Sequence, residues 1–100
     1  MPRFVVINEQ GPAWVEGRSM REQAGWTDHA AFMDALEADR TVILGGPLRG
    51  SGKHRALLVV EGPDERSVRH RLELDPWMRS GILRNVSFEA WELLLGRIGG

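Results

Sequence analysis

Hydrophobic residues gather in short β-branched runs that predict strands. Each run is bounded by glycine, proline or charged residues, which is typical of strand ends. The three clearest runs are residues 3–8, 41–48 and 55–62. A fourth candidate strand spans residues 82–96, where an alternating pattern continues through Val86 and Phe88. Its phase changes at Ala90 and Trp91, so we expect a bulge or a short added strand there.

A helical spacing of apolar residues predicts a first helix over residues 27–39. Phe32, Met33 and Leu36 would form its buried stripe, because residues three and four apart share one face of a helix. Thr27 is the expected N-cap, since its hydroxyl can accept a backbone N–H of the first turn.

A second helix is predicted after Asp64, which is a suitable N-cap residue. Val68 and Leu72 mark its buried face. We expect the helix to end at Asp75, because the residue before a proline avoids the α-helical region.

The predicted element order is βαββαβ, the ferredoxin-like arrangement of an α+β domain. We therefore expect residues 1–100 to form one domain, with a four-stranded antiparallel sheet and two helices on one face. The first and third strands are apolar on both faces, yet the helices can cover only one. A second copy of the chain is the simplest cover for the other face. The sequence therefore predicts a homodimer.

This topology places two residues of chemical interest at the same end of the sheet. His29 lies in the first turn of the first helix, and Asp75 lies at the end of the second. Both positions fall at the end of the fold where the first strand finishes. Each residue also continues the buried face of its own helix. The long segment 9–25 reaches this end too, as does the expected turn formed by Gly45, Gly46 and Pro47.

A histidine and an aspartate in contact have a defined chemistry. A carboxylate that accepts a hydrogen bond from one imidazole nitrogen fixes the tautomer of the ring. The other nitrogen is then free to move a proton on a bound substrate. The alternative is that the two residues are unrelated, because helix ends collect polar residues in any protein. Spacing alone leaves both interpretations open.

Composition limits the classes of function. Hydrophobic residues make up 42% of the chain and charged residues 27%, as in a folded globular protein. The net charge of −1 argues against nucleic acid as a partner. The chain has no cysteine, which excludes disulfides, thiolate nucleophiles and cysteine zinc sites. The sequence has no signal-peptide core and no apolar run of membrane length, so we expect a cytoplasmic protein that does not bind membranes.

Other residues could complete a site around this pair. Trp26 and Trp77 flank the two residues and could form the aromatic wall of a pocket, although core packing is the alternative. Arg21 could meet a substrate carboxylate, or anchor the loop by an ion pair with Glu22. The glycine-rich segment 50–53 lacks the context of a phosphate-binding loop and is expected to be a hairpin turn. The three histidines show no metal-ligand spacing, so we expect no metal.

Several of these motifs together resemble the YCII-related family. They are the H-x-x-F-M-x-x-L pattern of residues 29–36, GGPL at 45–48, DPW at 75–77 with GIL at 81–83, and a tryptophan at 91. The segment REQAGW at 21–26 is similar to the longer-loop members, and the resemblance spans nearly the whole chain. It implies a ferredoxin-like dimeric α/β barrel whose site is centred on a histidine and an aspartate, here His29 and Asp75. It also implies relatives that include muconolactone-isomerase-like and dehydrochlorinase enzymes acting on small cyclic or aromatic acids.

We therefore hypothesise an enzyme that works without a cofactor on a small acidic or cyclic organic molecule, by isomerase or lyase chemistry. His29 would be the general base and acid, Asp75 its orienting partner, and segment 9–25 a lid. The substrate pocket would include Arg21, Trp26, Gly45, Gly46, Pro47 and Trp77. One alternative is a non-catalytic dimer that binds a small molecule or serves as an accessory module. Another is a cofactor-free monooxygenase, a chemistry found on similar barrels.

Overall fold

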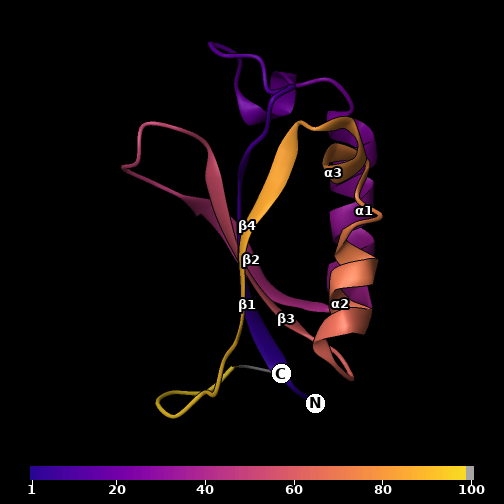
Figure 1. Cartoon of the computed structure of the whole chain (residues 1–100), viewed down its shortest axis with the longest axis vertical. Coiled ribbons are helices and arrows are strands. Elements are labelled where there is room, and N and C mark those ends of the chain that lie inside the picture. Colours follow the sequence, from indigo (N-terminus) through magenta and orange to yellow (C-terminus); the bar gives the residue numbers. More distant parts are fainter. Residues whose placement is uncertain (99–100) are drawn as a thin grey trace.

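The computed structural model describes residues 1–98 and shows a sheet covered on one side by helices (Figure 1). The sheet has four antiparallel strands in the order β2-β3-β1-β4. This is the ferredoxin-like α+β fold that the element order predicts. None of the helices in this part of the chain is long and apolar enough to cross a membrane. In chain order the elements are β1 (Arg3–Gln10), the 3-10 helix η1 (Met20–Glu22), α1 (Trp26–Ala38), β2 (Val42–Leu48), β3 (Arg55–Glu61), α2 (Glu65–Leu72), α3 (Pro76–Ser80) and β4 (Leu83–Ala90).

Helix α1 begins one residue earlier than predicted, and its N-cap is not Thr27. Gly25 occupies the N-cap position in the left-handed region, at φ 77° and ψ 15°. Its carbonyl accepts the N–H of His29 at 3.0 Å, which starts the helical hydrogen bonding. Glycine adopts a positive φ without the steric penalty of a side chain, so the helix can begin directly at Trp26.

The predicted second helix is in fact two helices. α2 follows Asp64, whose carboxylate accepts a backbone N–H of the first turn at 2.8 Å, as the sequence predicts. It ends at Leu72 and does not continue to Asp75. Asp75 instead caps α3, where it accepts the N–H of Trp77 at 2.9 Å and a proline occupies the first turn. Aspartate followed by proline therefore starts a helix here and does not end the one before it.

Strand β4 is shorter than predicted, and its irregularity lies elsewhere. The strand ends at Ala90, because its partner β1 begins opposite that point. The register between β1 and β4 shifts between Ile7 and Asn8, where Val86 is the additional residue on β4. The bulge predicted at the end of this strand is therefore wrong, since only the pairing with β1 determines where the extra residue falls.

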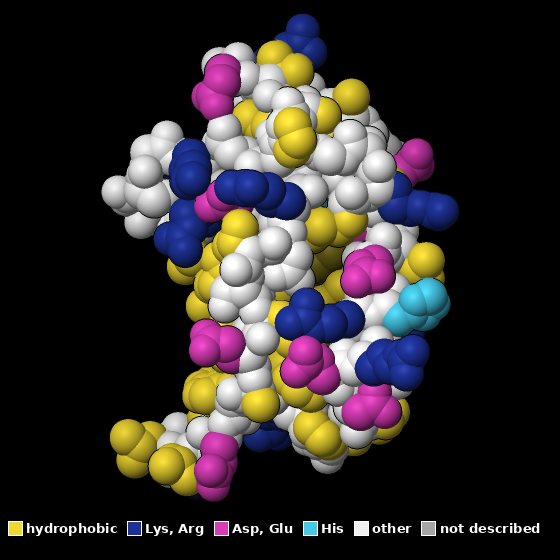
Figure 2. Space-filling model, viewed as in Figure 1, with side chains coloured by type: hydrophobic (Ala, Val, Ile, Leu, Met, Phe, Trp, Pro, Cys, Tyr) yellow, Lys and Arg dark blue, Asp and Glu magenta, His cyan; other side chains and the backbone are white. Residues whose placement is uncertain are grey.

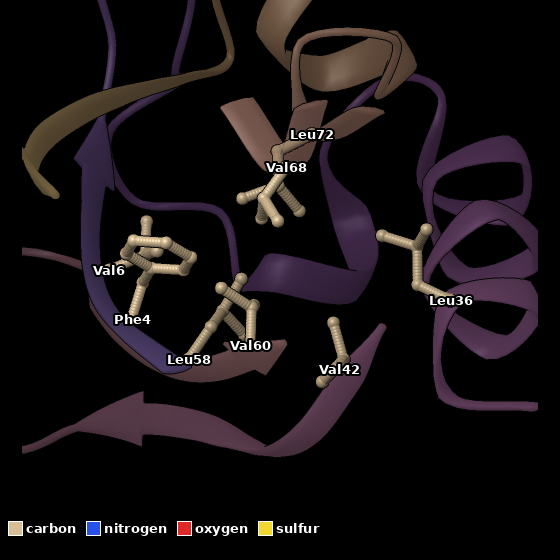
Figure 3. Packing of buried hydrophobic residues seen from close by; sticks show 8 residues of the cluster. All are labelled: Phe4, Val6, Leu36, Val42, Leu58, Val60, Val68 and Leu72. Carbon is tan, nitrogen blue, oxygen red and sulfur yellow. The ribbon is translucent and has the colours of Figure 1, made fainter. Parts of the chain in front are cut away.

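The helix-facing side of the sheet forms the main core of the molecule (Figure 3). Side chains from three strands meet side chains from α1 and α2 there. In the first helix Leu36 is fully buried, and Phe32 and Met33 pack against the main core from half-buried positions, as predicted. The buried members of the main core are Phe4, Val6, Leu36, Val42, Leu58, Val60, Val68 and Leu72.

The helix-facing side chains become smaller or polar toward the end of the sheet where α1 begins. Along β1, Phe4 and Val6 are followed on the same face by Asn8. On β3 the corresponding positions are Val60, Leu58 and Ala56. This loss of side-chain volume leaves a space between the sheet and α1 at that end.

The other side of the sheet has no helix packed on it from residues 1–98 (Figure 1). Val5 lies opposite Val59 on this side, and Ile7 lies opposite Leu57. Leu44 on β2 shares this side and is 53% exposed. Both faces of β1 and β3 are therefore apolar, as the sequence predicts.

Beyond β4 the chain leaves the body of the molecule and exposes hydrophobic side chains. Leu94 and Leu95 are 78% and 88% exposed. In Figure 2 this segment is the group of hydrophobic side chains at the lower left, in the place of the yellow loop of Figure 1. Packing within a single chain thus leaves these leucines in water.

Candidate active site

His29 and Asp75 lie in contact, although 46 positions separate them in sequence. Nδ1 of His29 is 2.9 Å from both carboxylate oxygens of Asp75. The residues are 8% and 3% exposed. The fold places α3 beside the beginning of α1, which brings the two side chains together (Figure 1). Asp75 reaches His29 as the cap of α3 and not, as the sequence suggested, as a continuation of the second helix.

The surroundings of Asp75 determine which nitrogen of His29 carries a proton. Besides His29, the carboxylate accepts the N–H of Trp77 through Oδ1. An ionised carboxylate only accepts hydrogen bonds, so Nδ1 of His29 is the donor in this contact. Nε2 is then unprotonated in the neutral ring. This is the tautomer that a general base requires.

Trp77 fixes the plane of the His29 ring. The two rings are parallel, with centroids 4.0 Å apart and an interplanar angle of 5°. Trp77 is held in turn because its Nε1 donates to the carbonyl of Ala24 at 2.7 Å. The prediction that Trp77 lines a pocket is wrong: it is 1% exposed and packs in a second hydrophobic cluster with Ile82 and Leu83. It is the buried residue of the five-residue helix α3, so its burial is what attaches that helix to the fold.

A cleft of about 490 Å³ opens beside His29, between α1 and the sheet. Its volume lies within the range of small-molecule sites. Met33 on α1, Val42 on β2 and Leu58 on β3 contribute apolar walls. Six of the lining residues have polar or charged side chains, namely Asn8, Arg21, His29, Asp34, Glu37 and His54. An apolar cleft with a few convergent polar groups is typical of a binding site for a small organic molecule.

Five of the six residues predicted for a substrate pocket line this cleft. They are Arg21, Trp26, Gly45, Gly46 and Pro47. The last three belong to β2 and not to a turn. Gly45 faces Leu58 on β3, and a Cβ atom at Gly45 would come within 2.6 Å of the Leu58 side chain. Glycine at this position therefore allows β2 to pair with β3 beside the cleft.

His54 also faces the cleft, and the sequence-based prediction missed it. The residue lies just before β3 and stacks on Trp14, with ring centroids 4.6 Å apart and an interplanar angle of 11°. Burial lowers the pKa of His54 from its ordinary value near 6.5, and repulsion between the two imidazoles when both carry a proton lowers it further. His54 is therefore a neutral imidazole at neutral pH. No local pattern identified it, because its place depends on Trp14 from a distant loop.

Asn8 follows Phe4 and Val6 on the helix-facing side of β1. Those two residues belong to the main core, and Asn8 borders the cleft. The residue is 6% exposed, and its Oδ1 is a buried atom without a hydrogen-bond partner among the described residues. The sequence contains a pattern that could have identified Asn8. Phe4, Val6 and Asn8 occupy one face of a strand, so a polar residue follows two apolar ones on the side that packs against the helices.

Gln23 organises the long segment between β1 and α1. Its side-chain oxygen accepts the N–H of Val15, and its nitrogen donates to the carbonyl of the same residue, both at 2.9 Å. The nitrogen also lies 3.1 Å from the carbonyl of Arg18. Gln23 is 3% exposed, so these bonds are shielded from water and hold the segment in one shape.

Arg21 and Glu22 do not form the ion pair that was one of two expectations for the loop. Glu22 accepts the backbone N–H of Ser19 at 2.9 Å, within a capping box. Arg21 lies over the ring of Trp26, with its guanidinium carbon 5.5 Å from the ring centroid, at the border of the cleft. Its positive charge is therefore available to a ligand there.

The glycine-rich segment 50–53 forms the hairpin between β2 and β3, as predicted. Lys53 in this hairpin lies 3.3 Å from the carboxylate of Glu9, which also accepts hydrogen bonds from Arg84. The bonds from Arg84 and Lys53 lower the pKa of Glu9. Glu9 alternates with Asn8 along β1, so this charged cluster lies on the sheet face away from the cleft.

The site as a whole can bind a small molecule and exchange protons with it. It combines one oriented imidazole, a second neutral imidazole and a carboxamide in apolar surroundings. Within residues 1–98, no three or more His, Cys, Asp or Glu side chains are grouped so as to hold a metal ion.

Comparison with solved structures supports the fold. The chain is similar to 5-chloro-2-hydroxyhydroquinone dehydrochlorinase from Burkholderia phenoliruptrix, in a complex with 2,5-dihydroxybenzoquinone. The TM-score is 0.64 and the sequence identity 21%, over 89% of this chain and 93% of that one. At this identity the likeness shows the fold alone. No family model and no curated protein matches the chain, so the YCII-related family remains a resemblance.

Proposed function

We propose that this protein is an enzyme that moves protons on a small cyclic or acidic organic molecule, by lyase or isomerase chemistry. The observation that carries the proposal is the buried contact between His29 and Asp75 at the wall of an apolar cleft. His29 takes a proton through Nε2 as a general base and returns it as a general acid. Asp75 orients the ring and stabilises the imidazolium that forms.

Three features favour this role over an unrelated pair of helix-end residues. Asp75 approaches Nδ1 of His29 with both carboxylate oxygens, which selects one tautomer. Trp77 stacks on the ring and fixes its orientation. His29 then borders a cleft of the size of a small ligand, whereas a purely structural helix end needs no cleft.

The name of the structural neighbour fits this chemistry. When a chlorinated hydroquinone loses hydrogen chloride and becomes a quinone, two hydroxyl groups give up their protons and the ring carbon that bears chlorine gains one. Chloride leaves with the electrons of the C–Cl bond, and the electrons of the two O–H bonds form the quinone carbonyls. Such a reaction needs a base beside the ring, and in our proposal Nε2 of His29 is that base. Met33, Val42 and Leu58 supply the apolar walls that a six-membered ring would contact.

We also propose that the protein acts as a homodimer. Val5, Ile7 and Leu57 line a sheet face on which no helix from residues 1–98 packs. The exposed Leu94 and Leu95 offer further apolar surface beyond β4. A second copy would bury both surfaces, which a single chain leaves in water. Sedimentation or light scattering at micromolar concentration would then give twice the monomer mass of 11.2 kDa.

The catalytic proposal is tested with 5-chloro-2-hydroxyhydroquinone, by following chloride release and the absorbance of the quinone product. We expect His29→Gln to reduce the rate by about 100- to 10,000-fold, the usual contribution of a general base. Asp75→Asn keeps the cap on α3 but no longer selects the tautomer of His29, so it reduces the rate as well. His70→Gln is the matched control, because His70 is exposed on α2.

A second readout does not depend on the choice of substrate. Nitrogen-15 chemical shifts of the histidine rings show which nitrogen is protonated. We expect the Nδ1–H form of His29 in the wild type and a mixture of forms in Asp75→Asn. A mixture already present in the wild type, or a full rate in His29→Gln, would contradict the proposed mechanism.

A further inference from the structure

We propose that Asn8 is a ligand-binding residue of the cleft, and that its carboxamide selects rings carrying a hydroxyl or oxyanion group. The inference deepens the proposed function, on which it rests for the location of the ligand. It assigns a role to a buried polar side chain that the His29–Asp75 chemistry does not use.

The place of Asn8 in the sheet is not one that a polar side chain normally takes. It stands on the face of β1 that Phe4 and Val6 use to enter the main core. Asn8 is 6% exposed, so its carboxamide has lost most of its contact with water. A buried amide is normally paired, because leaving its hydrogen-bonding groups unmet is costly.

The fold does not provide the missing partner among the described residues. Oδ1 of Asn8 is buried and makes no hydrogen bond. The two residues across the sheet from Asn8 are Ala56 on β3 and Asn85 on β4. Ala56 has no polar side chain, and Oδ1 of Asn85 accepts the N–H of Ser87. The Asn8 carboxamide therefore remains free to turn its oxygen or its nitrogen toward a molecule in the cleft.

The neighbours of Asn8 indicate the chemistry of that molecule. His29 and His54 border the same cleft, and Leu58 and Leu83 contribute apolar surface beside them. Apolar walls select a flat or aliphatic body, whereas the imidazoles and the carboxamide select polar substituents on its edge. A carboxamide can donate to an oxyanion and accept from a hydroxyl, so it fits both ionisation states of a hydroxylated ring.

The closing experiment compares two rings of nearly equal size, 2,5-dihydroxybenzoquinone and 2,5-dimethylbenzoquinone. Thiol addition to these quinones does not occur in this protein, since it has no cysteine. Calorimetric titration of the wild type and Asn8→Leu gives the affinities, and Asn8→Ala serves as a second variant should leucine disturb folding. Asn85→Leu is the matched control, because it makes the same change at an exposed residue across the sheet.

We expect Asn8→Leu to weaken binding of the dihydroxy ring by about 10- to 100-fold, because a site built for a polar group loses its partner. Binding of the dimethyl ring is expected to be unchanged or stronger. Asn85→Leu is expected to alter neither affinity. The unfolding temperature of Asn8→Leu should not fall, because an amide without a hydrogen-bond partner is replaced by an apolar group of similar volume.

Two results would overturn the assignment of Asn8. One is an equal loss of affinity for both rings in Asn8→Leu, which would mean that Asn8 shapes the cleft without recognising a hydroxyl. The other is a lower unfolding temperature in Asn8→Leu, which would show that the amide serves the fold. A wild type that binds neither ring overturns the ligand class itself.

The failure of this inference can be distinguished from the failure of the proposed function. One outcome is that Asn8→Leu loses affinity for the dihydroxy ring only, while the wild type releases no chloride. This outcome supports the binding role of Asn8 and rejects the catalytic proposal. Chloride release that depends on His29 but not on Asn8 supports the catalytic role and rejects the binding one.

Discussion

The two ends of the layer between sheet and helices are built from the same strands but differ in what fills them. At one end, Phe4 and Val6 from β1 meet Leu36 from α1, and these residues are between 0% and 4% exposed. At the other end, Asn8 and His29 take the equivalent positions and border a cleft. The first end provides apolar burial and so supplies stability. The second end places polar groups where apolar ones would stabilise the fold more, which is typical of functional sites.

The comparison shows how a small domain can contain both parts without a separate binding domain. The strands keep one face toward the helices along their whole length, and only side-chain size and polarity change. On β3 this change is the step from Val60 and Leu58 to Ala56. The cleft is therefore a continuation of the core in which the side chains no longer fill the space.

The largest effect is expected for Trp77→Ala, which removes a buried residue beside His29 at the cleft end. Trp77 is fully buried, so its truncation should lower the free energy of unfolding by about 3–5 kcal/mol. It also removes the ring on which His29 stacks. Urea denaturation measures the loss, with Trp91→Ala as control at a residue that is 38% exposed. A loss below about 1 kcal/mol would show that α3 is attached by other contacts.

An intermediate effect is expected when one residue at each end is enlarged on the same strand. Val60→Leu adds one carbon to a fully buried residue of the main core and should cost about 1–3 kcal/mol. Ala56→Leu adds three carbons but extends into the cleft, so it should cost less than about 0.5 kcal/mol.

The same pair of variants should separate stability from binding. Ala56→Leu is expected to abolish titration with 2,5-dihydroxybenzoquinone because it fills the ligand space. The variant Val60→Leu should keep that binding once its lower stability is allowed for. Equal costs of the two enlargements would mean that the cleft is closed in solution.

The smallest effect concerns the pH dependence that His54 contributes. Its pKa is lowered in the folded state, so the unfolded chain takes up a proton first as the pH falls. The free energy of unfolding should therefore decrease as the pH drops below about 6.5. In His54→Gln this part of the decrease should be absent, whereas the control His70→Gln should retain it. Thermal unfolding between pH 5 and 8 measures the difference. A steeper decrease in His54→Gln would reverse the sign that we expect.

The sequence predicted the parts of the fold that depend on local periodicity. Apolar runs marked all four strands, and helical spacing marked the buried side of α1. The cap at Asp64 followed from residue type alone. Chain topology then sufficed to place His29 near Asp75, because the direction of each element is determined by the one before it.

The parts that were missed depend on contacts between distant segments. The bulge at Val86 arises from pairing with β1, and no property of β4 by itself reveals it. Its position next to Asp75 predicts Trp77 at the cleft. Trp77 instead belongs to α3, a short helix that the sequence did not predict, so the direction of its side chain could not be predicted either. His54 depends on the stack with Trp14, which the fold of the long loop creates.

The two parallel stacks of tryptophan on histidine have an optical consequence. His29 lies on Trp77 and His54 lies on Trp14, so each imidazole has an indole within 5 Å of its ring centre. A protonated imidazole in such contact quenches indole fluorescence, so the emission of this protein reports the charge on both rings. Substituting Trp14 by phenylalanine removes the indole beside His54 and leaves Trp77 and Trp26 as the indoles close to His29. The protein therefore contains its own unlabelled probe for events in the cleft.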